Sequence, residues 1–328
     1  MSKAKLKTSA MIASIADAGQ ATRSAPFGHA LVELARTRPE IVGLTADLAK
    51  YTDLHIFRDA MPDRFYQMGM AEQLLMGAAA GLAHEGYIPF ATTYATFASR
   101  RAFDFIHQAI VEEGLNVKIA CALPGLTTGY GPSHQATEDL AMMRTIPDLV
   151  VIDPCDAIDI EQAVPAIADY KGPVYMRLLR GQVPVVLDTY DYRFEIGKAQ
   201  LLAEGDDVLV ISTGLMTMQA LSVAKKLVAD GIGIAVLHTP TLKPLDTGTI
   251  LREAAHGGRL VVTAENHTVV GGLGQAVASA LLEGGVTPTF RQIALPDAFL
   301  DAGALPTLHD RYGISVETMS ASIKRWLA

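Results

Sequence analysis

The sequence predicts an α/β protein with two doubly wound domains, in which helices cover both faces of a mostly parallel sheet. Three observations support this prediction. Short apolar runs alternate with longer segments of helical period, as buried parallel strands joined by helices do. The chain has 328 residues, too many for one ordinary core. A stretch with a proline, several charges and no helical period divides the alternation into two parts.

The first part extends over residues 25–184. Its apolar runs predict strands at 41–45, 87–93, 117–122, 149–152 and 174–178. The segments between them predict helices at 27–37, 71–86, 97–113, 136–144 and 157–169. We therefore expect a domain whose loops meet at the carboxyl edge of a parallel sheet, where such sheets bind ligands.

A linker at 185–195 leads to a second, smaller domain at 196–328. Its expected strands are 208–212, 233–238, 260–264 and 289–293, and its expected helices are 216–230, 246–255, 274–282 and 316–327. Residues 1–24 are expected to form an N-terminal arm. Lysines 3, 5 and 7 resemble the start of a secretion signal, but the following apolar run is short and Asp17 interrupts it.

The composition narrows the class of partner. Half of the residues are hydrophobic and 19% are charged, yet no uninterrupted apolar run approaches a membrane span. The excess apolar surface points to subunit contacts. The net charge is −8 without a basic cluster, which makes nucleic acid an unlikely partner. Cys121 and Cys155 lack metal or redox spacing, so we interpret them as buried small hydrophobes in a reducing cytoplasm.

One carboxylate, Glu72, opens a run of small and apolar residues at 69–81. The small residues allow a helix to pack closely, so Glu72 is expected at a helix start with almost nothing polar beside it. Desolvation favours the protonated form of a carboxyl, and such a group can serve as a general acid. The plainer alternative is a capping glutamate in the first helical turn, stabilised by the helix dipole.

Other polar and aromatic side chains follow the expected strands of the first domain. Asp47 follows the first strand, and Tyr94, Phe97 and Arg100 follow the second. The glycine-rich loop at 124–134 follows the third and ends in His134. Together they are typical of a site, although Phe97 alone would suggest core packing and His134 alone a solvated loop. In the second domain the glycine cluster at 271–274 is interpreted as close helix packing and not as a dinucleotide site, because the full spacing is missing.

Several motifs in order resemble one known family. They are Thr45-Ala46-Asp47-Leu48, Gly69-Met70-Ala71-Glu72-Gln73, Gly131-Pro132-Ser133-His134-Gln135 with Glu138, and Gly172-Pro173-Val174-Tyr175 leading to Arg180. Over almost its full length the chain resembles the C-terminal half of transketolase, and specifically the C-terminal subunit of a split transketolase. The resemblance implies a pyrimidine-binding domain followed by a transketolase C-terminal-like domain.

The resemblance implies thiamine diphosphate as the cofactor. Glu72 matches the family glutamate that hydrogen-bonds the pyrimidine ring nitrogen, and this bond favours the imino tautomer whose nitrogen deprotonates the thiazolium carbon. Phe97 matches the aromatic residue that stacks on the pyrimidine, and Tyr94 matches a neighbouring pocket residue. Asp47 matches an acid near the cofactor at the subunit interface. Arg100 replaces a tyrosine and follows the pattern of deoxyxylulose-phosphate synthase, so we expect it beside the cofactor.

The same resemblance assigns substrate contacts. His134 matches a histidine that contacts substrate oxygens, and Arg23 and Arg180 fall where the family places sugar-phosphate-binding arginines. Tyr130 stands where transketolases carry an acidic pair whose aspartate reads a sugar hydroxyl. A site that loses such a group changes its preference. We therefore expect a donor other than xylulose 5-phosphate.

The chain has no Gly-Asp-Gly motif, with which the family holds Mg²⁺ and the diphosphate. We expect no metal site of its own and an N-terminal partner subunit that supplies Mg²⁺, around a homodimer core in a heterotetramer. Two alternatives remain open. One is the beta subunit of a thiamine-dependent 2-oxoacid dehydrogenase, and the other is a non-catalytic binding protein with the same body.

Overall fold

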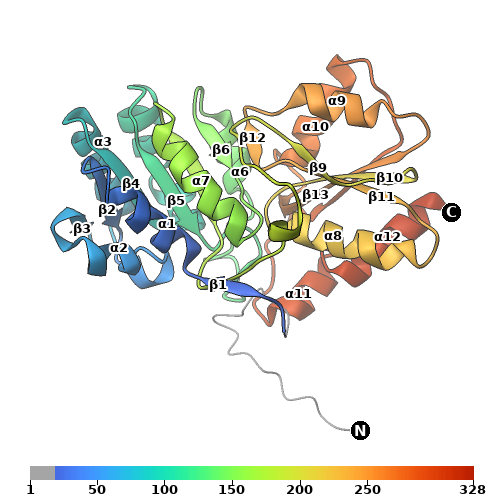
Figure 1. Cartoon of the computed structure of the whole chain (residues 1–328), viewed down its shortest axis with the longest axis horizontal. Helices are drawn as coiled ribbons and strands as arrows, with labels where there is room; N and C mark the ends of the chain where they lie inside the picture. The colour runs from blue at the N-terminus through green and yellow to red at the C-terminus, as the bar shows by residue number, and fades with distance from the viewer. Residues whose placement is uncertain (1–18) are drawn as a thin grey trace, which may run out of the picture.

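The computed structural model describes residues 19–328, so the lysine-rich part of the predicted arm lies outside the described residues. Figure 1 shows two α/β domains side by side, each with a central sheet between helices. The prediction of two doubly wound α/β domains is therefore confirmed. Within the described range, no helix combines the length and the apolar character that crossing a bilayer requires.

The first domain is built on a sheet of seven strands in the order β12-β6-β7-β5-β4-β2-β3. Every neighbouring pair in it is parallel except β12 with β6. The strands are β2 (Ile41–Thr45), β3 (Phe65–Gln67), β4 (Ile88–Tyr94), β5 (Lys118–Ala122), β6 (Val150–Ile152), β7 (Val174–Leu178) and β12 (Thr241–Lys243). Five of these strands match the predicted ranges to within one residue at each end, because they are continuous apolar runs.

Helices cover both faces of this sheet because successive strand side chains point to opposite sides. On β4, for example, Phe90 joins one hydrophobic cluster and Ala91 the other. Side chains of α1 (Pro26–Ala35), α2 (His55–Ala60) and α7 (Ala157–Asp169) belong to the first cluster. The second includes α3 (Glu72–His84), α4 (Ala95–Arg101), α6 (Asp139–Thr145) and, as a partly buried neighbour, α5 (Phe103–Phe105).

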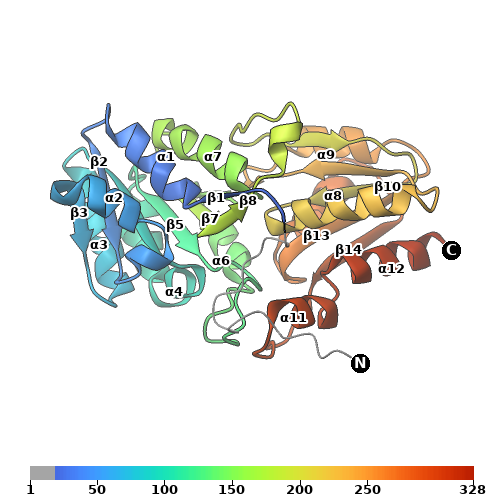
Figure 2. The same ribbon diagram turned by 60° about the horizontal axis from the view of Figure 1, so that its bottom comes forward.

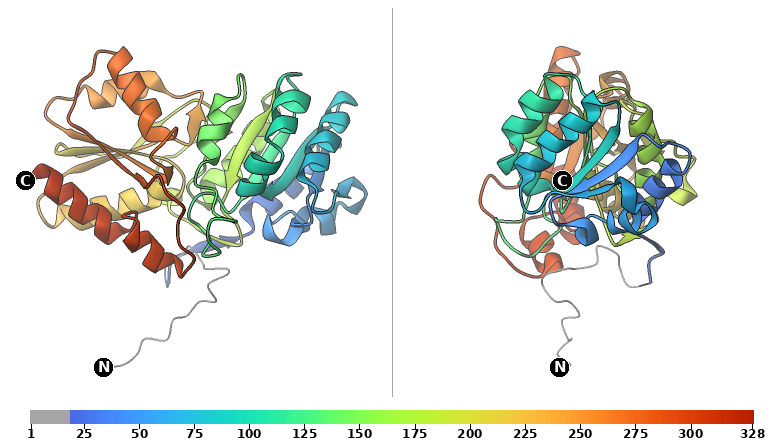
Figure 3. Two further views of the ribbon diagram at one scale, coloured as in Figure 1. Left: turned by 180° about the vertical axis from the view of Figure 1, so that it is seen from behind. Right: turned by 90° about the vertical axis from the view of Figure 1, so that its left-hand side faces the viewer.

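The second domain has a five-stranded sheet in the order β14-β13-β10-β11-β9, in which only β9 is antiparallel to its neighbour. The strands are β9 (Gln200–Ala203), β10 (Val208–Ser212), β11 (Ile234–His238), β13 (Leu260–Thr268) and β14 (Phe290–Leu295). Its helices are α8 (Leu215–Val228), α9 (Thr247–Ala254), α10 (Leu273–Glu283), α11 (Leu305–Arg311) and α12 (Val316–Leu327). Seen from behind, α9 and α10 lie on one side of the sheet and α8 and α12 on the other (Figure 3).

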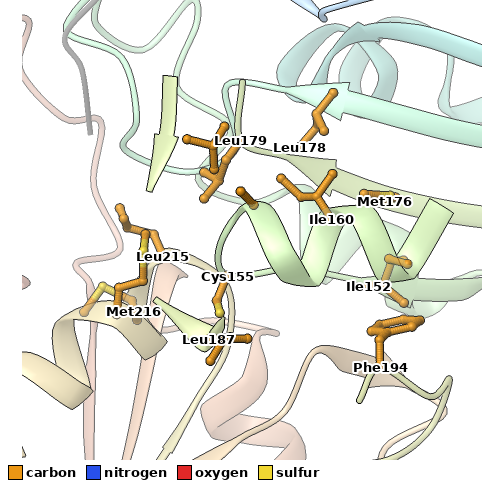
Figure 4. Packing of buried hydrophobic residues seen from close by; sticks show 14 of the residues in the cluster. Ile152, Cys155, Ile160, Met176, Leu178, Leu179, Leu187, Phe194, Leu215 and Met216 are labelled. Atoms are coloured by element: carbon orange, nitrogen blue, oxygen red, sulfur yellow. The ribbon is translucent and has the colours of Figure 1, made fainter. Parts of the chain in front are cut away.

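The two domains share structure. Strand β12, from the second domain's part of the chain, pairs with β6 at the edge of the first sheet. The end of the predicted arm forms β1 (Thr22–Ser24), which pairs antiparallel with β8 (Gln182–Pro184) near the domain boundary (Figure 2). Both hydrophobic clusters run across that boundary, and Figure 4 shows Cys155 and Leu187 packed between Ile160 and Met216. Both cysteines are buried, as predicted.

Several local predictions were wrong. The single helix predicted over 97–113 is broken into α4, the short α5 and a π-helical turn η3 (Ile106–Val111). Strands β3, β9 and β12 were missed because three or four residues carry too little periodic signal. The predicted linker at 185–195 stays a prediction as a domain boundary; the segment is packed against the core and holds a short 3-10 helix η4 (Leu187–Thr189), with Leu187 1% and Phe194 5% exposed.

Candidate active site

The carboxyl ends of four parallel strands meet at one edge of the first sheet. Their register places Thr45 opposite Thr92, Tyr94 opposite Ala122, and Ala122 opposite Leu178. The ends of these strands, the segments that follow them and the start of α3 carry the residues singled out from the sequence, except Arg23. Ligands of open α/β sheets bind at this edge.

Glu72 is the first residue of α3 and is only 4% exposed. The expectation of a buried carboxyl at a helix start is met. The expectation that almost nothing polar lies beside it was wrong, because Arg101 Nη1 donates to Glu72 Oε1 at 3.0 Å. Sequence reasoning did not single out Arg101, although its position directly after Arg100 on α4 was a signal. The adjacent arginines face different partners.

Four rings gather at this edge. The ring centre of Phe97 lies 5.5 Å from Tyr94 and 5.4 Å from His134, and Tyr130 lies 5.0 Å from His134. On the other side, the guanidinium carbon of Arg101 lies 3.9 Å from the centre of the Phe97 ring. Tertiary structure therefore joins residues from α3, α4 and the glycine-rich loop in one cluster, as their order after the strands predicted.

Two polar groups of the cluster, His134 and Tyr94, have shifted pKa values. Burial, helped by the positive charge of Arg101, holds the pKa of His134 below its ordinary value. The imidazole is therefore largely neutral at pH 7 and can both donate and accept a hydrogen bond. Ser133 Oγ lies 2.8 Å from its Nδ1. Burial raises the pKa of Tyr94 to about 12, so its phenol remains a hydrogen-bond donor.

Asp47 is connected to the start of α3 through one side chain, Gln67. Asp47 N–H donates to Gln67 Oε1 at 2.8 Å, and Gln67 Nε2 donates to Asp47 Oδ1 at 3.0 Å. Gly69 N–H donates to the same Gln67 oxygen at 3.1 Å. Asp47 has a φ of 58° and is exposed at the rim. Gln67 thus ties the loop at Asp47 to the loop that leads into α3, a role that the sequence did not indicate.

Arg100, predicted beside the cofactor, is fully engaged with the loop that carries His134. Its Nη1 donates to Pro132 O at 2.8 Å and its Nη2 to Gln135 O at 3.0 Å. Its Nε pairs with the Glu138 carboxylate. Burial raises the pKa of Glu138, but the hydrogen bonds from Arg100 and Thr137 outweigh it and hold that pKa below the ordinary value. A contact of Arg100 with a cofactor stays a prediction.

The two predicted phosphate-binding arginines lie in different surroundings. The guanidinium carbon of Arg180 lies 5.6 Å from the centre of the Tyr51 ring, and its buried Nε has no hydrogen-bond partner among residues 19–328. Its positive charge also acts to lower the pKa of Tyr94, against the larger effect of burial, so Arg180 is within electrostatic reach of the ring cluster. Arg23, on β1, forms an ion pair with Glu161 of α7. The structure therefore brings Arg180 to the cluster and leaves Arg23 paired elsewhere.

The second domain holds both ends of the glycine-rich loop. Asn266 Oδ1 accepts from Leu126 N–H at 2.8 Å, and Thr268 N–H donates to Thr137 O at 2.7 Å. The contact at the loop start is so close that a Cβ on Gly125 would lie 2.1 Å from Asn266 O. Position 125 therefore requires glycine, which also accepts its φ of 54° without strain.

In the second domain, the N–H groups beside the glycine cluster at 271–274 are bound by a side chain of the protein, Glu265. Glu265 accepts hydrogen bonds from the N–H groups of Leu273 at 2.6 Å and Gly274 at 2.8 Å, at the start of α10. Burial raises the pKa of Glu265 to about 7. A Cβ on Gly272 would lie 1.9 Å from Glu265 Oε2. The interpretation as close packing, and not as a dinucleotide site, is confirmed.

One buried group in the described part of the chain has the donor atoms of a metal site. Potential ligand atoms of Cys155, Asp159 and His238 lie within 4.8 Å of one another. Asp159 already accepts from His238 Nε2 at 2.9 Å and from Tyr192 OH at 2.7 Å. Thr217 Oγ1 lies 2.8 Å from the other ring nitrogen of His238. These bonds satisfy the carboxylate and imidazole without an ion, so the group is a buried hydrogen-bond network.

The fold and this edge define a two-domain α/β protein with a buried glutamate beside an aromatic cluster. Comparison with models of known protein families identifies both domains. Residues 19–185 match the transketolase pyrimidine binding domain, and residues 197–319 match the transketolase C-terminal domain. The chain belongs to the transketolase family.

Three similar proteins refine this assignment. A transketolase family protein of Sinorhizobium fredii is 69% identical, over 98% of this chain and 94% of its own length. The 6-deoxy-6-sulfo-D-fructose transketolase subunit of a Clostridium species is 40% identical, over 88% of each chain. A solved structure described as a split gene transketolase, inactive beta4 tetramer, is 43% identical with a TM-score of 0.84, over 94% of this chain and 98% of that one. These matches favour transketolase over 2-oxoacid dehydrogenase.

Proposed function

We propose that this chain is the C-terminal subunit of a split transketolase. It transfers a two-carbon ketol unit from a ketose or ketose phosphate to an aldose or aldose phosphate, and only together with an N-terminal partner subunit. The observation that carries the proposal is that Glu72, 4% exposed, lies at the sheet edge that carries the Phe97 and His134 rings, linked to Phe97 through Arg101. The similarity to a split-gene transketolase supports it.

The residues present fit thiamine diphosphate. Glu72 is a buried carboxylate placed to hydrogen-bond a ring nitrogen, and Phe97 is an aromatic face for offset stacking of the pyrimidine. The cofactor, when bound, supplies the carbon nucleophile that carries the two-carbon unit. The protein contributes orientation: Glu72 fixes the protonation of the pyrimidine, and the neutral imidazole of His134 hydrogen-bonds substrate oxygens.

The partner subunit completes the site. This chain lacks the Gly-Asp-Gly motif, so Mg²⁺ and the diphosphate are held by the partner. Two exposed apolar side chains flank Glu72 in the sequence and support docking near the start of α3: Met70 is 82% and Leu74 57% exposed. Asp47 stands at the same rim, where the family places an acid at the subunit interface. Two copies of the chain form the core of a heterotetramer.

The donor differs from xylulose 5-phosphate. The centre of the Tyr130 ring lies 5.0 Å from the centre of the His134 ring, so a phenol stands where other transketolases carry a carboxylate. Arg180 remains beside the cluster to bind an anionic substituent of the sugar. A relative named for 6-deoxy-6-sulfo-D-fructose supports a modified ketose whose anionic group is not necessarily a phosphate.

The test is turnover of the chain mixed with its N-terminal subunit, thiamine diphosphate and Mg²⁺. A panel of ketoses, including xylulose 5-phosphate and 6-deoxy-6-sulfo-D-fructose, is offered with a phosphorylated aldose, and each subunit alone is the control. Ketol transfer in the mixture alone is expected. Full activity of the single chain would refute the split site, and decarboxylation of a 2-oxoacid without ketol transfer would favour the dehydrogenase.

A further inference from the structure

Arg101 makes two contacts at once in the candidate active site. Its guanidinium carbon lies 3.9 Å from the centre of the Phe97 ring, and its Nη1 lies 3.0 Å from Glu72 Oε1. The first contact places a flat, delocalised cation over an aromatic face. The second is a charge-assisted hydrogen bond to the buried carboxylate.

These two contacts are the ones that the proposed function gives to the pyrimidine ring. In that proposal the ring stacks on Phe97 and hydrogen-bonds Glu72, the two side chains that Arg101 contacts here. Glu72 is 4% exposed and Arg101 already engages one of its oxygens. A pyrimidine cannot take up the same contact with Glu72 while the guanidinium remains there.

We propose that Arg101 occupies the pyrimidine position in the lone chain and has to leave before the cofactor binds. The inference rests on the proposed function, since it concerns the same site. Arg101 is then a displaceable residue that lowers the affinity of the single subunit for thiamine. Without it, Glu72 would be a buried carboxylate lacking that ion pair, so its departure is coupled to the arrival of a replacement partner.

The neighbouring arginine shows why Arg101 can move. Arg100 uses all three guanidinium nitrogens in bonds to the loop at 132–138. Within the described part of the chain, the Arg101 side chain makes one hydrogen bond, and it is 53% exposed. An exposed arginine on a helix end can rotate into solvent without disturbing the backbone, and it loses one ion pair and one cation–π contact.

The test measures binding and needs no turnover. Thiamine, which carries the pyrimidine but no phosphate, is titrated calorimetrically into the lone wild-type chain and its Arg101→Met and Arg101→Lys variants. We expect Met to tighten binding roughly tenfold, since both contacts of the guanidinium must otherwise be broken. Arg101→Lys keeps the charge but loses the planar stack, and an intermediate gain is expected. Arg36→Met removes an exposed arginine that directly follows α1, and it is expected to leave the affinity unchanged.

The outcomes separate this inference from the proposed function. Equal or weaker thiamine binding by both Arg101 variants would overturn the role of Arg101, as would an equal gain in Arg36→Met. The mixture with the N-terminal subunit is tested in parallel by equilibrium dialysis with thiamine diphosphate and Mg²⁺. Binding in that mixture without a gain in the variants overturns the inference alone. No binding in any sample overturns the proposed function, and the inference with it.

Discussion

Arg177 and Asp139 form an ion pair in the interior of the molecule, where their side chains are 1% and 0% exposed. Arg177 Nη1 also donates to Asp153 Oδ2 at 3.2 Å and to Asn266 O, in the second domain, at 3.1 Å. Asp139 opens α6, directly after the loop that carries His134. One guanidinium therefore joins the first sheet, the site loop and the second domain.

Replacing Arg177 by Met is expected to lower the free energy of unfolding by about 3–5 kcal/mol, because it leaves a buried carboxylate unpaired. Denaturant unfolding followed by circular dichroism measures the loss. Lys226→Met is the matched control: its pair with Glu317 is exposed, and its removal is expected to cost about 0–1 kcal/mol. Equal midpoints for the two variants would contradict the prediction.

Asn266 is expected to control the mobility of the glycine-rich loop. Asn266→Ala removes the acceptor of the Leu126 N–H, which is buried, and costs about 1–3 kcal/mol. Hydrogen exchange of the segment around Leu126 should accelerate. Asn266→Asp retains an acceptor oxygen at the same place and should restore much of the protection. Unchanged exchange in the alanine variant would show that the loop is held by other contacts.

Lys118 is expected to make the free energy of unfolding depend on pH, because its pKa differs between the folded and unfolded chain. It is fully buried on β5, and its Nζ donates to Tyr170 O at 2.8 Å and Gly172 O at 2.7 Å. Burial lowers the pKa of Lys118 to about 7, whereas the pKa of a lysine in the unfolded chain is about 10.4. Between these values the unfolded chain binds more protons than the folded one, so the free energy of unfolding rises with pH.

Urea unfolding between pH 7 and pH 9 measures this contribution. The wild-type free energy should rise relative to that of Lys118→Met, by at most about 1.4 kcal/mol per pH unit. The stabilisation is present above the unfolded pKa and is lost as the pH falls through about 7. Parallel curves for the two proteins would show that Lys118 does not titrate in this range.

Glu72 is expected to be required for turnover of the reconstituted enzyme. Glu72→Gln keeps the size of the side chain but cannot exchange the proton with the pyrimidine, so activity should fall by at least about 100-fold. Glu85→Gln, an exposed residue at the other end of α3, is the control and should retain activity. If Glu72→Gln retains activity with an unchanged melting temperature, the role given to Glu72 is wrong.

Tyr130 is expected to set donor preference. Tyr130→Asp restores the carboxylate of other transketolases, and it should raise kcat/KM for xylulose 5-phosphate relative to the best natural donor by at least about tenfold. Tyr130→Phe keeps the ring near His134 but loses the hydroxyl, which separates hydrogen bonding from shape. A panel of ketoses provides the measurement. Identical donor ratios in all three proteins would exclude Tyr130 from substrate selection.

The sheet and its functional edge were largely readable from local sequence. Continuous apolar runs such as 41–45 and 174–178 become strands with the expected bounds because burial on both faces imposes that pattern. Polar residues directly after such runs must meet at the carboxyl edge. The grouping of Tyr94, Phe97 and His134 follows from this rule.

Other features could not be read from sequence because they depend on partners far along the chain. Strand β12 is three residues long, and only its pairing with β6 defines it. Gln67 gains its role from contacts with two loops, and the hydrogen bonds of Arg100 to the loop at 132–138 depend on where that loop folds. No proline or glycine lies at the break between α4 and η3, so the sequence does not indicate it.

The sequence by itself determined the fold class, the edge of the sheet that carries the site and the kind of residues found there. Periodicity and the order of motifs encode these properties locally. Only the tertiary structure decided which charged side chains form ion pairs. A side chain such as Arg101 can reach several partners. Its contact with Phe97 is local, four residues earlier on α4, whereas the packing of α4 against α3 brings Glu72 to it.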